Sequence, residues 1–153
     1  MTQPPQGGPL PKFEDFRVTE VFKGKPAVPI LQTPGQRMFR TKIREGAKAG
    51  ANFAGHYAIA QWGCGSECVS IAIIDEKAGT VYATPFDWLG YPPPLTYADV
   101  VKDTDAPLIY KVDSRLLIVR GCAEDKDCAS FYYEWTGSQF KLLRKLPAIA
   151  RKP

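Results

Sequence analysis

The chain has 153 residues, of which 44% are hydrophobic and 24% are charged, and this balance indicates one globular domain with its own core. No stretch of 18 consecutive apolar residues occurs, so no membrane-spanning helix is predicted. The net charge is +4, without the dense basic stripe typical of nucleic-acid binding, so no nucleic-acid partner is expected.

The charge is spread unevenly along the chain. Residues 1–50 contain nine basic and four acidic side chains, residues 51–110 two and seven, and residues 111–153 nine and five. This pattern predicts either pairing of the basic ends with the acidic middle or a basic face for an anionic partner, such as a cell-wall polymer or an acidic protein.

The first eleven residues hold four prolines and two glycines without a periodic apolar pattern, so residues 1–11 are predicted to be a mobile tail. Residues 12–153 are predicted to form a single globular domain. The tail has neither the basic start nor the apolar stretch of a signal peptide. Weak alternation over residues 13–31 predicts two short strands.

The best helix of the sequence covers residues 34–48. Thr33 is expected to be its N-cap, and Gln36 completes a capping box. Cationic side chains crowd the other faces, so Arg40 and Arg44 are expected to face water. The helix is predicted to pack on a sheet through an apolar stripe that recurs every four residues, Phe39, Ile43 and Ala47.

Beyond residue 50 the apolar period changes from about four to two, which predicts strands. Residues 56–62 alternate between two faces, as in a strand. Residues 69–74 form an apolar run typical of a strand buried on both faces, and residues 80–84 are predicted to form the next strand after a hairpin loop. A proline-rich insert covers residues 85–112, and a second antiparallel meander follows over residues 115–144. The predicted fold class is α+β: one main helix on a strongly bent antiparallel sheet of about six to eight strands, barrel- or sandwich-like.

The four cysteines form two close pairs, Cys64 with Cys68 and Cys122 with Cys128. An even count in local pairs favours an exported protein with disulfide bonds. The residues between each pair allow the chain to turn, so we expect both bonds to form locally, although spacing also permits two crossed connectivities. Structural zinc and free thiols are the alternatives, and the second pair fits zinc-ligand spacing poorly. No metal site is predicted.

The most distinctive segment runs from Asn52 to Cys68 and contains the only Asn and the only His of the chain, Asn52 and His56. Its Asn-Phe-Ala-Gly-His-Tyr motif is followed by Trp-Gly-Cys-Gly-Ser-Glu-Cys. With short pieces at 114–117 and 133–137, this segment resembles a family of small exported bacterial proteins of unknown function, over about half of the chain. The resemblance implies a β-rich domain and an envelope location. Without a signal peptide in this sequence the protein is either cytosolic or has its signal peptide outside this sequence, and the cysteine pairs favour the second, a periplasmic or secreted location. The resemblance implies no reaction.

His56 is the residue best suited to chemistry, because imidazole titrates near neutral pH. The alternative function is therefore a hydrolase or thiol enzyme centred on His56, with Cys68 as nucleophile if that thiol is free. The simpler interpretation is structural: Asn52 caps the loop that leaves the helix, and His56 hydrogen-bonds a strand or loop. The sequence has no phosphate-binding loop or dinucleotide fingerprint, and one His cannot build a histidine metal site, so no cofactor is expected.

Aromatic residues of the insert are a second indication of a site. Trp88 and Tyr91 stand near three consecutive prolines and are predicted either to form a rigid contact surface or to fold under the insert. We expect any ligand to contact these two rings together with Asn52 and His56. The function that this pattern favours is a non-catalytic envelope binding module, of an inhibitor or immunity type, whose partner is a protein or a cell-wall polymer.

Overall fold

The computed structural model describes residues 8–91, 95–96 and 106–150, so most of the predicted tail and part of the predicted insert lie outside the described residues. Strands predominate over helices, which confirms the α+β class in its β-rich form. The elements in chain order are η1 (Phe13–Phe16), α1 (Pro34–Met38), α2 (Arg40–Lys48), β1 (Tyr57–Gly63), β2 (Cys68–Asp75), β3 (Val81–Tyr82), β4 (Leu89–Gly90), β5 (Leu95–Thr96), β6 (Leu108–Tyr110), β7 (Leu116–Ala123), β8 (Asp127–Trp135), β9 (Phe140–Pro147) and β10 (Ile149–Ala150).

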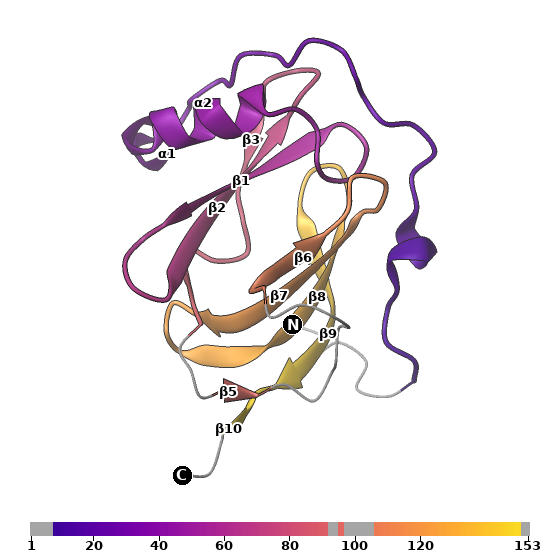
Figure 1. Cartoon of the computed structure of the whole chain (residues 1–153), viewed down its shortest axis with the longest axis vertical. Coiled ribbons are helices and arrows are strands. Elements are labelled where there is room, and N and C mark those ends of the chain that lie inside the picture. The colour runs from indigo at the N-terminus through magenta and orange to yellow at the C-terminus, as the bar shows by residue number, and fades with distance from the viewer. Residues whose placement is uncertain (1–7, 92–94, 97–105, 151–153) are drawn as a thin grey trace.

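Eight strands form one antiparallel sheet, which agrees with the predicted range (Figure 1). The main order is β1-β2-β4-β7-β8-β9, with β3 paired to β2 and β6 paired to β7, and a separate ladder joins β5 to β10. The meanders β1–β2 and β7–β8–β9 match the two predicted from alternation. The short strand β4 links them by pairing with both β2 and β7. The sheet is open between β1 and β9, so the closed form of the predicted barrel-like sheet is not found.

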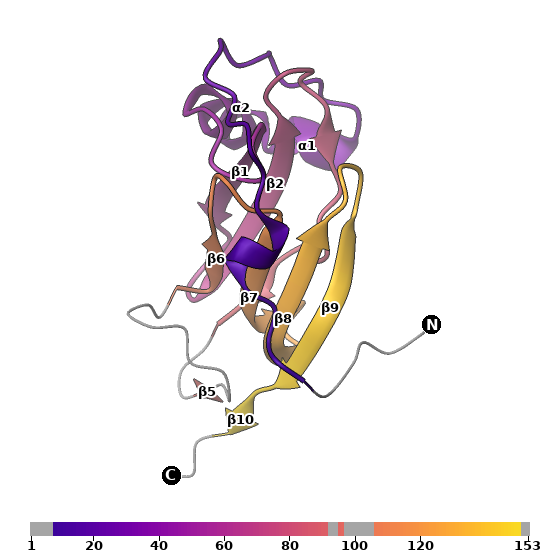
Figure 2. The ribbon, with the colours of Figure 1, turned by 90° about the vertical axis from the view of Figure 1, so that its right-hand side faces the viewer.

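The sheet curls around its main core. Tyr57 of β1 and Trp135 of β8 are separated by three strands in the sheet order, yet their ring centroids lie 5.2 Å apart. On the outer side, α2 covers a cluster on β1 and β2, and the N-terminal segment with η1 covers another on β7 and β8 (Figures 1 and 2). Because β2 lies between two of these clusters, it is buried on both faces, as its apolar run predicts.

The segment that precedes the helices differs from the prediction. The two strands predicted over residues 13–31 are wrong: the range contains η1 and is joined to the sheet by isolated bridges. Pro26 and Pro29 interrupt this segment, and proline has no N–H to donate to a ladder. A weakly alternating sequence with such interruptions therefore stays irregular.

The ends of the predicted helix are confirmed. The Thr33 hydroxyl accepts a hydrogen bond from the Gln36 N–H at 3.1 Å, and the Gln36 side chain accepts one from the Thr33 N–H at 3.4 Å. At the other end, α2 stops at Lys48, and Gly50 follows with a φ of +94°. The capping box and the glycine stop therefore act as the sequence predicts.

The middle of the predicted helix is interrupted at Phe39, whose φ of −105° and ψ of 24° separate α1 from α2. Ile43 and Ala47 pack on the sheet, but Phe39 is 39% exposed, so its predicted burial is wrong. The interruption changes the helical phase and moves Phe39 out of the apolar stripe. Its ring lies against Trp62 instead, with centroids 5.1 Å apart.

Candidate functional site

The side chain of Asn52, one of the predicted binding residues, is hydrogen-bonded to the backbone of β1. Its Oδ1 accepts a hydrogen bond from the Ile59 N–H at 2.7 Å, and its Nδ2 donates one to the Ile59 carbonyl at 3.2 Å. Since β1 is an edge strand, the carboxamide takes the place of a neighbouring strand at this residue. Asn52 lies in the loop that leaves the helix, as predicted, but its side chain has a structural role on the edge of β1 instead of capping that loop.

The residues after Asn52 make a tight turn. Phe53 is fully buried and exchanges two backbone hydrogen bonds with Tyr57, each 3.0 Å long. Ala54 and Gly55 both have positive φ, 50° and 91°. A side chain at Gly55 would collide with the Glu20 carbonyl. The close approach of the N-terminal segment therefore explains the glycine of the motif.

His56 follows this turn and lines a small hollow of about 320 Å³. Its Nε2 lies 3.9 Å from Asp75 Oδ1, and its side chain is 32% exposed. Its ring lies over Tyr57, with centroids 4.2 Å apart. Burial raises the pKa of Tyr57, so the Tyr57 hydroxyl stays protonated at neutral pH. The charged contact of this site is therefore the one between His56 and Asp75.

A buried carboxyl group that sequence reasoning missed lies next to His56. Glu76 is fully buried, and neither of its carboxylate oxygens has a hydrogen-bond partner among the described residues. Its backbone N–H donates to the His56 carbonyl at 2.8 Å. Burial, with a smaller contribution from Asp75, raises the pKa of Glu76 to about 7. The sequence places Glu76 in a polar hairpin loop, where carboxylates are ordinarily exposed, so no local signal identifies it.

The two halves of the predicted shared site lie at opposite ends of β2. At one end, His56 lies beside Asp75, the last residue of the strand. At the other end, Cys68, the first residue, is paired with Gly90 of β4. The strand between these ends is about 23 Å long, at roughly 3.3 Å per residue. The structure therefore separates the four predicted binding residues into two groups, Asn52 with His56 and Trp88 with Tyr91.

Both disulfide bonds form locally, as predicted, with Cα atoms 5.2 Å apart for Cys64–Cys68 and 3.8 Å apart for Cys122–Cys128. No cysteine is free, which excludes the zinc and free-thiol alternatives, and Cys68 cannot serve as a nucleophile. In the register of the sheet, Cys68 pairs with Gly90, Gly90 with Cys122 and Cys122 with Cys128. The two bonds therefore brace one end of the sheet on either side of β4, and they indicate an oxidising compartment.

Between the two disulfides, β4 is flanked by two exposed aromatic side chains. Trp88 is 37% exposed and Tyr91 is 38% exposed. The Trp88 indole N–H donates to Asp125 Oδ2 at 3.4 Å, and the Trp88 carbonyl accepts from the Glu124 N–H at 3.0 Å. The Tyr91 N–H donates to the Glu67 carbonyl at 2.9 Å. We call these five residues the rim: Glu67, Trp88, Tyr91, Glu124 and Asp125.

The three acidic residues of the rim have left-handed backbones, with φ of 55° at Glu67, 49° at Glu124 and 59° at Asp125. Such a conformation costs a residue with a Cβ atom roughly 1–2 kcal/mol, a cost that glycine avoids. Among the described residues, none of the three carboxylates pairs with a Lys or Arg side chain. The rim is therefore an acidic and aromatic surface held by strained turns.

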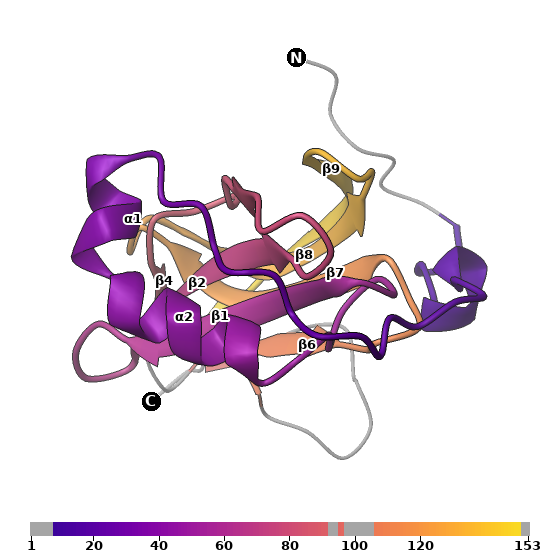
Figure 3. The ribbon, with the colours of Figure 1, turned by 90° about the horizontal axis from the view of Figure 1, so that it is seen from above.

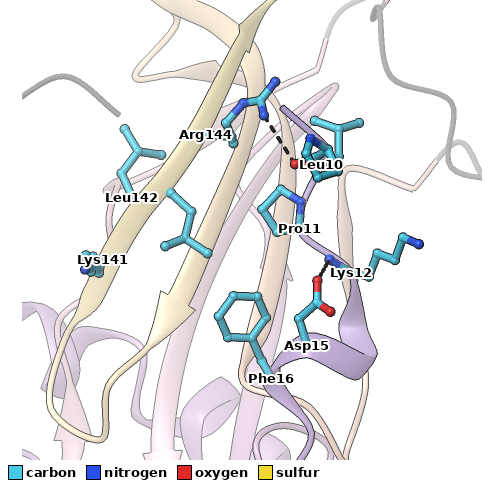
Figure 4. A pocket seen from close by; sticks show the side chains of 10 residues that line it. Leu10, Pro11, Lys12, Asp15, Phe16, Lys141, Leu142 and Arg144 are labelled. Carbon is cyan, nitrogen blue, oxygen red and sulfur yellow. Dashed lines mark hydrogen bonds between the residues drawn. The ribbon is translucent and has the colours of Figure 1, made fainter. Parts of the chain in front are cut away.

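A larger hollow of about 530 Å³ lies between the N-terminal segment and β9 (Figure 4). Arg144 of β9 donates hydrogen bonds to the Gly8 and Pro9 carbonyls at 3.1 and 3.4 Å. Asp15 accepts a hydrogen bond from the Lys12 N–H at 3.0 Å. The Arg144 hydrogen bonds hold the segment on the sheet, whereas the Asp15 hydrogen bond lies within the segment, so the hollow marks where the N-terminal segment is anchored.

Among residues 8–91, 95–96 and 106–150, no three His, Cys, Asp or Glu side chains are grouped so that they could hold a metal ion. In the same ranges, no helix has the length and apolar character needed to cross a membrane. No family model, curated protein or solved structure matches the chain. The resemblance to a family of exported bacterial proteins therefore stays a prediction.

Proposed function

We propose that the chain is a non-catalytic binding module of the bacterial envelope and that the rim contacts a protein partner, as an inhibitor or immunity protein does. The exposure of Trp88 and Tyr91 between two disulfide-closed turns carries this proposal. Aromatic side chains on a rigid support lose little conformational entropy on binding, and Trp and Tyr dominate the energy of many protein interfaces. The oxidising compartment that the disulfides indicate agrees with a periplasmic or secreted location.

The charge of the rim favours a basic protein over an anionic cell-wall polymer as its partner. The rim carries three carboxylates, at Glu67, Glu124 and Asp125, that pair with no Lys or Arg side chain among the described residues. An anionic polymer would be repelled by this surface, whereas Lys and Arg side chains of a protein would be attracted to it. The strained backbone supports the same conclusion, because glycine would relieve the strain but would remove the charge.

The alternative, a hydrolase centred on His56, is favoured by one observation, the His56–Asp75 pair beside a hollow. Its thiol form is excluded, since Cys68 is bonded to Cys64 and lies at the far end of β2. The hydrolase centred on His56 is therefore the second candidate function. Loss of a hydrolytic activity in a His56→Ala variant would support it, whereas unchanged partner binding by that variant agrees with the rim proposal.

A photo-crosslinking experiment tests the rim directly. Tyr91 is replaced by benzoylphenylalanine in the full chain, and a matched variant carries the same group at Phe39, which has nearly the same exposure, 39% against 38%. We expect irradiation in an envelope extract to attach one basic protein at position 91 and not at position 39. Addition of Trp88→Ala should abolish that adduct.

The affinity of the purified partner then measures the rim contribution. We expect Trp88→Ala to raise the Kd about 30-fold or more, the equivalent of about 2 kcal/mol for a central interface residue. The Kd should also rise with salt concentration, because the rim and its partner carry opposite charges. Equal adducts at positions 91 and 39, or an unchanged Kd in Trp88→Ala, would contradict the proposed function.

A further inference from the structure

The outer side of α1 and α2 carries cations that pair with no carboxylate in the described part of the chain, although Arg37 and Arg40 each donate a hydrogen bond to a backbone carbonyl. Residues 34–48 contain five Lys or Arg and one acidic residue, Glu45. Lys42 pairs with Glu45 at 3.9 Å. In the described part of the chain, no carboxylate pairs with the other four, which are Arg37, Arg40, Arg44 and Lys48. The two helices form the outermost layer on their side of the sheet (Figure 3), so these cations face water.

Three of these cations form a stripe. Arg40, Arg44 and Lys48 recur every four residues along α2, so they lie on one flank of the helix over about 12 Å. Like charges at this spacing destabilise a helix, and Arg40 stands at the positively polarised end. Packing through Ile43 and Ala47 does not require these charges. The stripe therefore points to an anionic partner.

Exposed apolar side chains accompany the cations. Six large hydrophobic side chains are exposed among the described residues, and four of them lie within residues 28–39. Met38 is 73% exposed and Phe39 is 39% exposed, at the junction of α1 and α2 between Arg37 and Arg40. Protruding apolar side chains between cations are typical of segments that rest in the headgroup region of a bilayer.

We propose that this helical face, which consists of Arg37, Met38, Phe39, Arg40, Arg44 and Lys48, docks on an anionic phospholipid surface. The guanidinium groups bind lipid phosphates in a bidentate manner, and Met38 and Phe39 enter the boundary between headgroups and acyl chains. An acidic protein would satisfy the charges but would require an apolar pocket for Met38. The helical face shares no residue with the rim, so docking on lipid does not depend on the proposed protein partner.

Flotation of the full chain with vesicles tests this proposal. We expect the chain to float with vesicles of phosphatidylglycerol and phosphatidylcholine, and to stay unbound with vesicles of phosphatidylcholine alone. High salt should release it, because the phosphate contacts are screened. Equal flotation with both vesicle types, or none with either, would overturn the proposal.

A charge-neutralising pair locates the docking face. Arg40→Gln with Arg44→Gln should weaken binding to the anionic vesicles about 25-fold, since each cation near the surface contributes about 5-fold, or about 1 kcal/mol. The control is Lys126→Gln with Lys141→Gln, which changes the net charge equally at two exposed sites outside both helices. Equal losses in the two double variants would show attraction by net charge alone, against the proposal. Both replaced arginines are exposed, and circular dichroism checks that the variants fold.

A third comparison distinguishes binding to lipid from binding to an acidic macromolecule in solution. Met38→Ser should weaken vesicle binding about 10-fold, because it removes the apolar contact, and leave any binding to polyglutamate unchanged. Trp88→Ala should leave vesicle binding unchanged. If Met38→Ser binds vesicles as wild type does, and polyglutamate competes with the vesicles fully, the helical face binds acidic polymers and the lipid proposal is wrong.

Discussion

The carboxamide of Asn52 hydrogen-bonds both backbone groups of Ile59, with Oδ1 2.7 Å from the amide nitrogen and Nδ2 3.2 Å from the carbonyl oxygen. The contact lies on the outer edge of β1, the first strand in the sheet order. An edge strand with free backbone groups is prone to pair with other chains, so Asn52 also protects the sheet from such pairing.

We expect Asn52→Ala to lower the free energy of unfolding by roughly 1–3 kcal/mol, because it leaves two partly buried backbone groups without partners. Asn52→Asp keeps the acceptor and loses the donor, so its loss should be smaller. Urea denaturation at neutral pH measures both values. The control is Gln139→Ala, which truncates an exposed side chain and should change stability by less than about 0.5 kcal/mol. A loss in Asn52→Ala no larger than in the control would contradict the structural role.

The buried carboxyl group of Glu76 makes stability depend on pH. Its pKa is raised from 4.5 to about 7 in the folded chain, mainly by burial and to a smaller extent by the charge of Asp75. Between these two pH values the folded chain keeps a proton that the unfolded chain loses, so stability falls as pH rises through this window. The free energy of unfolding falls by on the order of 3 kcal/mol, because a pKa raised by one corresponds to about 1.4 kcal/mol.

We expect Glu76→Gln to remove this part of the pH dependence, since the amide has a similar shape and does not titrate. The variant should match wild type near pH 4.5 and exceed it in stability at pH 8. Thermal unfolding at a series of pH values gives both curves, and the difference between them isolates the contribution of Glu76. Glu45→Gln, whose side chain is 63% exposed, is the control and should run parallel to wild type. A Glu76→Gln curve parallel to wild type would show that Glu76 is ionised when folded.

Local patterns in the sequence predicted the parts of the fold that neighbouring residues decide. The capping box at Thr33, the alternation of β1 and the continuous apolar run of β2 all depend on residues a few positions apart. The local disulfides were predictable for the same reason, because short polar loops can turn between the cysteines. Phe39 was placed wrongly since the period of four continued through a residue where the helix is interrupted.

The candidate sites depend on contacts between distant segments, which no local pattern contains. Glu76 is buried because the N-terminal segment crosses its turn, where the Ala27 N–H donates to the Glu76 carbonyl at 2.8 Å. Trp88 and Tyr91 flank the short strand β4, which pairs with β2 at the end that is far from His56. The sequence therefore identified Asn52, His56, Trp88 and Tyr91 but not Glu76, and only the fold shows that the first four form two groups.

The close packing of α2 on β1 leads to a prediction for two helical glycines. A Cβ atom at Gly46 would meet the Ala60 side chain and lie 3.0 Å from the Ala60 Cα, so Gly46→Ala must push the helix from the sheet. We expect a loss of roughly 1–3 kcal/mol from this overpacking, which exceeds the gain of about 1 kcal/mol that alanine gives in a helix. At Gly35 in α1 the nearest atom is Thr33 Oγ1 at 4.0 Å, so Gly35→Ala should stabilise the chain by about 0.5–1 kcal/mol. Urea denaturation of both variants measures the opposite signs, and a Gly46→Ala variant as stable as Gly35→Ala would show that α2 does not approach β1 this closely.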